Sequence, residues 1–172
     1  MLKKILVALD DSAMSAIVLE QALAIARAMN AHLMILHVLA VDEAGLPLEK
    51  FLKADQPMSF QVGQKFQQAW QTYQTEWETR LQSYVQQASA LGVPAEASQS
   101  YGNPGHVICD WVWAWKADLI VMGRQGQSQL PGWMMGSVSA YVTQHASCSV
   151  FLVSAAQKQE STEIRDRALT EV

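Results

Sequence analysis

The chain has 172 residues, of which 50% are hydrophobic and only 16% charged, with a formal net charge of -4 at pH 7. This composition indicates a globular protein of one domain with a sizeable core, and it excludes a disordered chain. The negative balance leaves no basic stripe for a phosphate backbone, so we expect no nucleic-acid partner.

The opening segment MLKKILVALD has the pattern of a strand rather than of a cleavable signal. No apolar run in the sequence reaches the roughly 18 to 20 residues that cross a bilayer, so we expect a cytoplasmic protein without membrane insertion. KILVAL (Lys4–Leu9) and LMILHVL (Leu33–Leu39) lack polar alternation, which is typical of strands buried on both faces of a parallel sheet.

Residues 12–30, between these two strands, carry apolar side chains at helical spacing. The pattern predicts a helix whose apolar positions at helical spacing are Ile17, Ala24 and Ala28 with their neighbours Leu23 and Ile25, and Asp11 or Ser12 is available as its N-cap. A strand-helix-strand unit therefore opens the fold.

The segment Val41–Gly63 mixes prolines, glycines and charges without a period, which predicts a long connection. From Gln64 to Leu91 helical spacing returns with an aromatic stripe, the kind of stripe that usually packs in a core. Its apolar positions are Phe66, Trp70, Tyr73, Trp77, Leu81, Tyr84, Val85 and Ala88. Gly92 suits the end of this helix, and a third strand, AEASQSY, follows at 95–101.

The second half repeats the alternation of helix and strand. Pro104 opens a helix with Ile108 and Val112 on one face and Trp113 on the other. The next elements are a strand at 117–123, a helix at 136–146 and a strand at Ser149–Val153. This order predicts an α/β fold with right-handed crossovers: a single open five-stranded parallel sheet, order 3-2-1-4-5, with helices on both faces. The charged tail, 155–172, is expected to be solvated.

Four glycines gather in GRQGQSQLPGWMMGSVS, residues 123–139, directly after the fourth strand. Ligands of open α/β sheets bind in the crevice where the strand order reverses. In the expected order this crevice lies between the glycine loop and the acids of LDDS, which follow the first strand. Gly136 and Ser137 open a helix whose first N–H groups favour an anion. The sequence therefore predicts a phosphate site.

Known phosphate loops do not match this stretch. No Lys follows the glycines as in a Walker loop, and neither the GxGxxG fingerprint nor the GxSxG elbow of hydrolases is present. The spacing instead is Gly123, two residues, Gly126, nine residues, Gly136 and then Ser137.

This spacing resembles the ATP-binding branch of the universal stress protein family. ILVALDDS, LHV, ADLIVMG and HASCSVFLV agree with the family in the same order, so the resemblance covers about Lys3 to Val153. It implies an adenine nucleotide alpha hydrolase-like fold, with a nucleotide-binding domain at 1–154 that contains the 41–63 connection.

The resemblance also implies which residues bind ATP. Asp10 would sit by the ribose or by Mg²⁺, and Val38 would pack on the adenine. Ala8 and Leu9 would also border the nucleotide, and Arg124 is a further expected ATP-binding residue. Ribose and phosphates would be lined by Met122, Gly123 and Gly126, and the phosphates would meet the amides and hydroxyls of Gly136, Ser137, Val138 and Ser139. It further implies a homodimer through Ser149–Val153 and a protein partner that the sequence does not identify.

Some of these residues have a purely structural alternative. A role as helix caps alone is the alternative for Asp10, Asp11 and Ser137. We expect that role for Asp11 and a functional one for Asp10. The four histidines show no metal-ligand spacing and are interpreted as structural. Cys109 and Cys148 are interpreted as buried small hydrophobic residues in a reducing compartment.

Three functions remain open at the level of sequence. The first is an ATP-binding regulatory module of the stress response, and the second a slow ATPase or phosphoryl-transfer enzyme. The third is a dimeric scaffold with an empty cleft. We expect no enzyme, or at most slow ATP hydrolysis, because no Lys or Arg occurs from Gln125 to Gln157 and Arg124 is the only basic residue in the glycine loop.

Overall fold

The structure, a computed structural model, describes residues 2–40, 60–125 and 134–154. Within these residues five strands form one parallel sheet in the order β3-β2-β1-β4-β5, as predicted. The strands are β1 (Lys4–Leu9), β2 (His32–Leu39), β3 (Ala95–Tyr101), β4 (Leu119–Gly123) and β5 (Ser149–Val153). Ala8 of β1 pairs with Leu36 of β2 on one side and with Met122 of β4 on the other, so β1 and β4 meet at the centre of the sheet.

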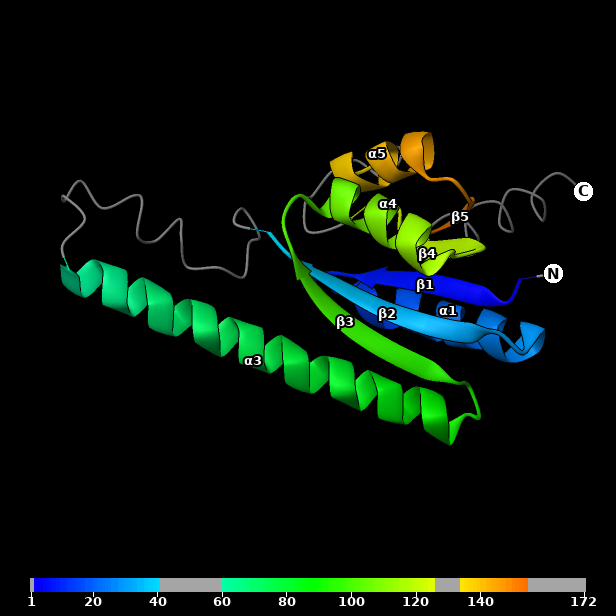
Figure 1. The fold of residues 1–172 in the computed structure, drawn as a ribbon, viewed down its shortest axis with the longest axis horizontal. Helices are drawn as coiled ribbons and strands as arrows, with labels where there is room; N and C mark the ends of the chain where they lie inside the picture. The colour runs from blue at the N-terminus through cyan, green and yellow to red at the C-terminus, as the bar shows by residue number, and fades with distance from the viewer. Residues whose placement is uncertain (1, 41–59, 126–133, 155–172) are drawn as a thin grey trace, which may run out of the picture.

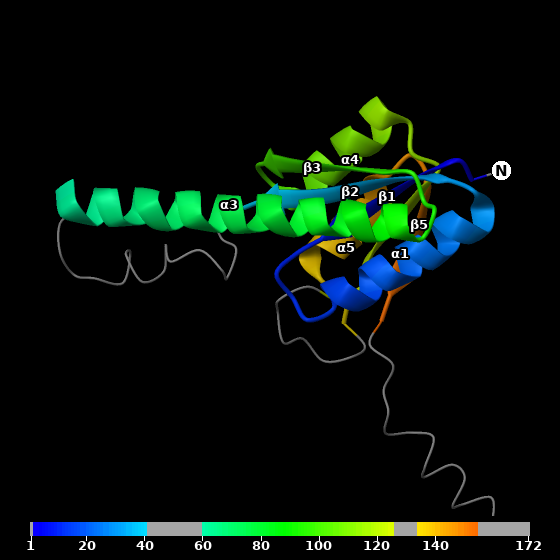
Figure 2. The same ribbon diagram turned by 90° about the horizontal axis from the view of Figure 1, so that it is seen from below.

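Helices cover both faces of the sheet (Figures 1 and 2). One face carries α1 (Ser15–Met29) and α3 (Phe60–Ala90), and the other carries α4 (Pro104–Trp115) and α5 (Ser137–His145). Each layer has its own apolar core, one around Trp77 and the other around Ile120. Strands as apolar as β1 and β2 are buried because helices pack on both of their sides.

The helix α1 differs from its prediction in start and in orientation. It begins at Ser15 after Met14, and neither Asp11 nor Ser12 caps it. Its buried face is Val18, Leu19, Ala22, Leu23 and Ala26, whereas Ile17 is 41% exposed and Ala24 and Ala28 lie outside the core. Both sets have helical spacing, so an almost entirely apolar helix does not reveal which face it buries.

The helix α3 begins at Phe60, four residues earlier than expected, so the predicted connection is shorter than 41–63. The rest of that connection, 41–59, and the predicted tail, 155–172, lie outside the described residues. The aromatic stripe packs as predicted: Tyr73, Trp77, Leu81 and Ala88 are buried against the sheet. Gly92 follows the helix with φ +73°, a left-handed angle that glycine adopts without strain.

The helices α4 and α5 follow the sequence closely. Asn103 caps α4 by accepting a hydrogen bond from the His106 amide at 3.4 Å, and Ile108 and Val112 are buried while Trp113 is 79% exposed. No helix in the described parts of the chain is long and apolar enough to cross a membrane.

Candidate functional site

A cavity of about 470 Å³ opens at the carboxyl ends of the central strands. Ten predicted site residues line it: Ala8, Leu9, Asp10, Val38, Met122, Gly123, Gly136, Ser137, Val138 and Ser139. Of the other two, Arg124 does not line the cavity, and Gly126 lies outside the described residues. The fold thus brings together residues more than a hundred positions apart in the sequence.

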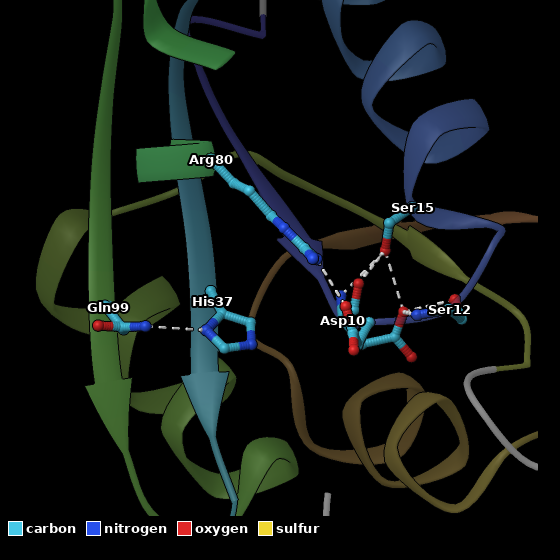
Figure 3. Close-up of polar contacts among 7 residues, drawn as sticks. Asp10, Ser12, Ser15, His37, Arg80 and Gln99 are labelled. Atoms are coloured by element: carbon cyan, nitrogen blue, oxygen red, sulfur yellow. Dashed lines mark hydrogen bonds and ion pairs between the residues drawn. The ribbon is translucent and has the colours of Figure 1, made fainter. Parts of the chain in front are cut away.

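The loop after β1 is ordered around the Asp10 carboxylate (Figure 3). Asp10 Oδ1 accepts hydrogen bonds from the Ser12 amide at 3.1 Å, from the Ser12 hydroxyl and from the Ser15 hydroxyl at 3.0 Å. Ser15 Oγ also contacts the Asp10 backbone, accepting from its amide at 3.0 Å and lying 2.6 Å from its carbonyl. Asp10 therefore has a fixed direction at the wall of the cavity.

The Arg124 carbonyl fixes the start of α5 against the end of β4. It accepts hydrogen bonds from the Gly136 amide at 3.0 Å and from the Ser139 hydroxyl at 2.7 Å. Gln125 Nε2 donates to the Met134 carbonyl at 2.7 Å and so joins the two ends of the loop whose residues 126–133 are not described. The contribution of Arg124 here is its backbone.

The first turn of α5 supplies donors for an anion. An α-helix leaves its first amides without an intrahelical acceptor, and in α5 these belong to Ser137, Val138 and Ser139, all at the cavity. Gly136, not Ser137, is the N-cap residue and makes no side-chain cap. Ser139 is 2% exposed and its hydroxyl faces the carbonyls of Arg124 and Gly136, so its side chain is structural and only its amide can serve a ligand.

The opposite wall of the cavity is apolar. Leu36, Val38 and Ala40 come from the end of β2, Met122 from β4 and Ile108 from α4. An apolar wall that faces amide donors and one carboxylate is the arrangement of small-molecule sites, in which few polar groups orient a mostly apolar ligand.

Sequence reasoning missed the side of the cavity formed by the start of α4. Asn103, Pro104, Gly105 and His106 line it, together with Tyr141 of α5. The signal was available, because the residues after β3 emerge at the same sheet edge as those after β1 and β4. His106 stacks on Tyr141 with ring centroids 4.6 Å apart, so this histidine belongs to the cavity rim.

The structure corrects two further predictions, one for Asp11 and one for the two cysteines. Asp11 does not cap α1: its carboxylate pairs with Arg80 of α3 at 2.6 Å. Cys109 and Cys148 are free and half-buried rather than fully buried, and burial raises the pKa of both thiols, which makes them less reactive. Within the described residues no three metal-ligating side chains gather.

Comparison with known proteins supports one family. A model of the universal stress protein family matches residues 1–154. The universal stress protein Sll1388 of Synechocystis is 38% identical over 151 residues, which are 87% of this chain and 96% of that protein.

Solved structures share the fold at lower identity. A universal stress protein in complex with cAMP is 23% identical with a TM-score of 0.57, covering 89% of this chain and 97% of that one. A family protein from Arabidopsis thaliana with AMP bound is 22% identical with a TM-score of 0.58, covering 92% of this chain and 97% of that one. At these identities the likeness concerns the fold.

Proposed function

Because the chain belongs to the universal stress protein family, we propose that its cavity binds ATP and that the protein is a nucleotide-dependent regulatory module of the stress response. The observation that carries the proposal is the polarity of one cavity, apolar at the end of β2 and rich in amide donors at the start of α5. ATP has the same division of polarity, with a purine at one end that suits the apolar wall and a triphosphate at the other that suits the amide donors. Two structures of similar fold, with cAMP and with AMP, support an adenine nucleotide.

Each part of ATP has a matching part of the cavity. The adenine would pack on Val38, and the ribose would lie near Asp10 and Met122. The phosphates would accept hydrogen bonds from the amides of Ser137, Val138 and Ser139 and would be favoured by the positive end of the α5 dipole. A cavity of about 470 Å³ is within the usual range for small-molecule sites, roughly 300 to 1,000 Å³.

Asp10 also fits an Mg²⁺ ion that enters with the nucleotide. Mg²⁺ is commonly held by one or two carboxylates together with substrate phosphates and water, so a single aspartate is sufficient. The Ser12 and Ser15 donors all reach Oδ1, so Oδ2 would be the oxygen offered to the ion. When bound, the ion would neutralise part of the phosphate charge.

The same residues support binding better than turnover. Among the described residues that line the cavity there is no Lys or Arg, whereas rapid phosphoryl transfer depends on cations around the γ-phosphate and a group that orients the attacking water. A slow ATPase remains the second candidate function.

We further propose a homodimer through β5. Among the described strands this one is at the edge of the sheet, with Phe151 43% exposed, so it offers an apolar edge to which no second described strand is paired on the outer side. Such edges pair readily with another strand, and pairing with a second copy gives a closed two-fold assembly.

Calorimetric titration with ATP tests the binding proposal, with two variants at Ser137 as a matched pair. Ser137→Pro deletes one amide at the first helical position, where proline is tolerated, and Gly136 at φ -64° and ψ 154° already has the extended angles that precede proline. Ser137→Ala keeps the amide. We expect Ser137→Pro to weaken ATP binding about 10-fold or more, as for the loss of a hydrogen bond to a charged group, and Ser137→Ala far less.

The same titration can contradict the proposal in two ways. Wild-type protein that binds neither ATP nor AMP would favour the scaffold with an empty cleft. Equal affinities in Ser137→Pro and wild type would show that the phosphates do not lie at the start of α5.

A further inference from the structure

We propose that Arg80 of α3 is a positioning residue for the nucleotide cavity and that it acts through Asp11. The inference rests on the proposed ATP site and extends it to a helix that contributes no residue to the cavity wall. It implies that the docking of α3 and the occupancy of the cavity are linked.

The contact joins two distant parts of the chain. The Arg80 guanidinium nitrogen Nη1 donates to Asp11 Oδ1 at 2.6 Å, across 69 positions of sequence. In Figure 3 the Arg80 side chain extends from α3 over the end of β1 to the loop that holds Asp10 and Ser12. The Arg80 side chain is 46% exposed and that of Asp11 30%, and exposed pairs of this kind contribute little to global stability.

Asp11 is the one residue from Leu9 to Ser12 that does not line the cavity. Its neighbours on either side do, and they are tied together, because Asp10 Oδ1 accepts from the Ser12 amide at 3.1 Å. A side chain that holds Asp11 therefore holds the backbone from which Asp10 points into the cavity.

Arg80 is also linked, through Trp77, to the strand β2 that contributes Val38 to the cavity. Its guanidinium lies 5.2 Å from the centre of the Trp77 ring, and Trp77 stacks on His37 of β2 with centroids 3.6 Å apart. His37 immediately precedes Val38, which we propose packs on the adenine. One turn of α3 thus contacts the loop after β1 and the neighbouring strand β2, both of which contribute residues to the cavity.

Charge gives Arg80 a second effect on the site. Asp10 and Asp11 are adjacent carboxylates at a cavity proposed to hold a triphosphate, and each would repel it in the absence of a counter-charge. The hydrogen bond to Asp11 raises the pKa of Arg80 further, so the guanidinium stays charged and neutralises Asp11. Asp10 is then the one carboxylate left for a metal ion.

Arg80→Gln tests the inference by calorimetric titration of ATP in the presence of Mg²⁺. We expect the affinity to fall by about two- to fivefold, a range typical of one exposed ion pair. Arg80→Lys should recover part of the loss. Arg27→Gln, in the last turn of α1, removes the same charge from an exposed position away from the cavity and should leave the affinity unchanged.

The decisive comparison is made in an Asp11→Asn background, where we expect Arg80→Gln to have no further effect. A loss of equal size with and without Asp11 would overturn the inference, because Arg80 would then act independently of it. Normal ATP binding by Arg80→Gln would also overturn it while leaving the proposed function intact. Wild-type protein that does not bind ATP would overturn both.

Hydrogen exchange of the ligand-free protein supplies a readout that does not need ATP. We expect faster exchange at the Ser12 and Ser15 amides in Arg80→Gln, since their loop loses its tether. Unchanged exchange there would contradict positioning through the loop.

Discussion

The imidazole of His37 stacks on the indole of Trp77 with ring centroids 3.6 Å apart and planes 10° from parallel. Both side chains are almost fully buried, at 0% and 1% exposure, and Tyr73 meets the same imidazole edge-on at 6.3 Å. Trp77 comes from α3 and His37 from β2, so this contact secures the long helix to the sheet beside the cavity.

Replacing Trp77 should therefore weaken the whole fold. Trp77→Ala removes the largest fully buried side chain, and we expect the free energy of unfolding to fall by about 3 to 5 kcal/mol in urea titrations. Trp113→Ala is the matched control, because Trp113 is 79% exposed and its loss should change stability by less than about 0.5 kcal/mol. Similar losses in both variants would show that α3 is not packed as described.

Gly105 allows α4 and α5 to approach at the rim of the cavity. A Cβ atom at this position would lie 2.7 Å from Tyr141 Cδ1 and 3.3 Å from Tyr141 Cβ, so the ring cannot simply turn away. We expect Gly105→Ala to destabilise the protein by about 1 to 3 kcal/mol, with recovery in the double variant Gly105→Ala/Tyr141→Ala.

Gly63 of α3 provides the opposite control in the same denaturation experiment. A Cβ there would meet nothing within 4 Å, so Gly63→Ala should stabilise the helix by roughly 0.5 to 1 kcal/mol. Opposite signs for the two substitutions are expected. Equal signs would contradict the close approach at Gly105.

Asp118 gives the fold a defined acid sensitivity. Its carboxylate accepts hydrogen bonds from the Lys3 and Lys4 amides at 2.8 and 2.9 Å, and these bonds hold its pKa below the usual 3.8. Because the pKa of Asp118 is lower in the folded state than in the unfolded state, its stabilisation is fully present at pH values above the unfolded-state pKa. The stabilisation disappears as the pH falls through the folded-state pKa. Asp118→Asn should be less stable than wild type at neutral pH, and the difference should begin to shrink as the pH falls below about 3.8 and vanish below the lower folded pKa. A difference that does not shrink with acidification would contradict an ionic origin.

The proposed dimer predicts a change of mass. Phe151→Lys places a charge on the exposed face of the edge strand β5, and we expect sedimentation to show monomers where the wild type forms dimers. A monomeric wild type at micromolar concentration, or a variant that stays dimeric, would place the interface elsewhere or exclude it.

Slow turnover of ATP is the last prediction. Without a Lys or Arg among the described cavity residues, we expect single-turnover hydrolysis with Mg²⁺ to be far slower than about 1 per second, the lower end of typical enzymes. A rate of that order that Asp10→Asn abolishes would establish the protein as an enzyme.

The periodicity of apolar residues and the alternation of strands and helices along the chain sufficed to predict the sheet and its strand order. Apolar runs such as Lys4–Leu9 and turn residues such as Gly92 carry their information locally, and the crossover rule leaves few topologies for five alternating units. The apolar face of α1 was predicted only in part: Leu23 is buried, but Ile17 is exposed and Val18 is buried in its place. Ile17 and Val18 are equally apolar, so the packing of α1 on the sheet decides between them.

The candidate site was predictable at the ends of β1, β2 and β4, where the strand order and the family resemblance point to the same residues. The glycine-loop spacing located Gly123, Gly136 and Ser137, and all three line the cavity. The pairing of Asp11 with Arg80 has no local signal, since it depends on where α3 crosses the sheet. Local propensity favours a helix cap for Asp11, but the tertiary contact takes its carboxylate instead.

Because α3 is long, a small rotation of the helix where it contacts the sheet would move its N-terminal end by a much larger distance. Its 31 residues span about 46 Å, whereas the seven residues of β3 span about 23 Å, and its N-terminal half extends past the end of the sheet (Figures 1 and 2). The turn that contains Trp77 and Arg80 lies far from the N-terminal end of the helix at Phe60. A tilt of about 5° at that turn would therefore move Phe60 by roughly 2 Å.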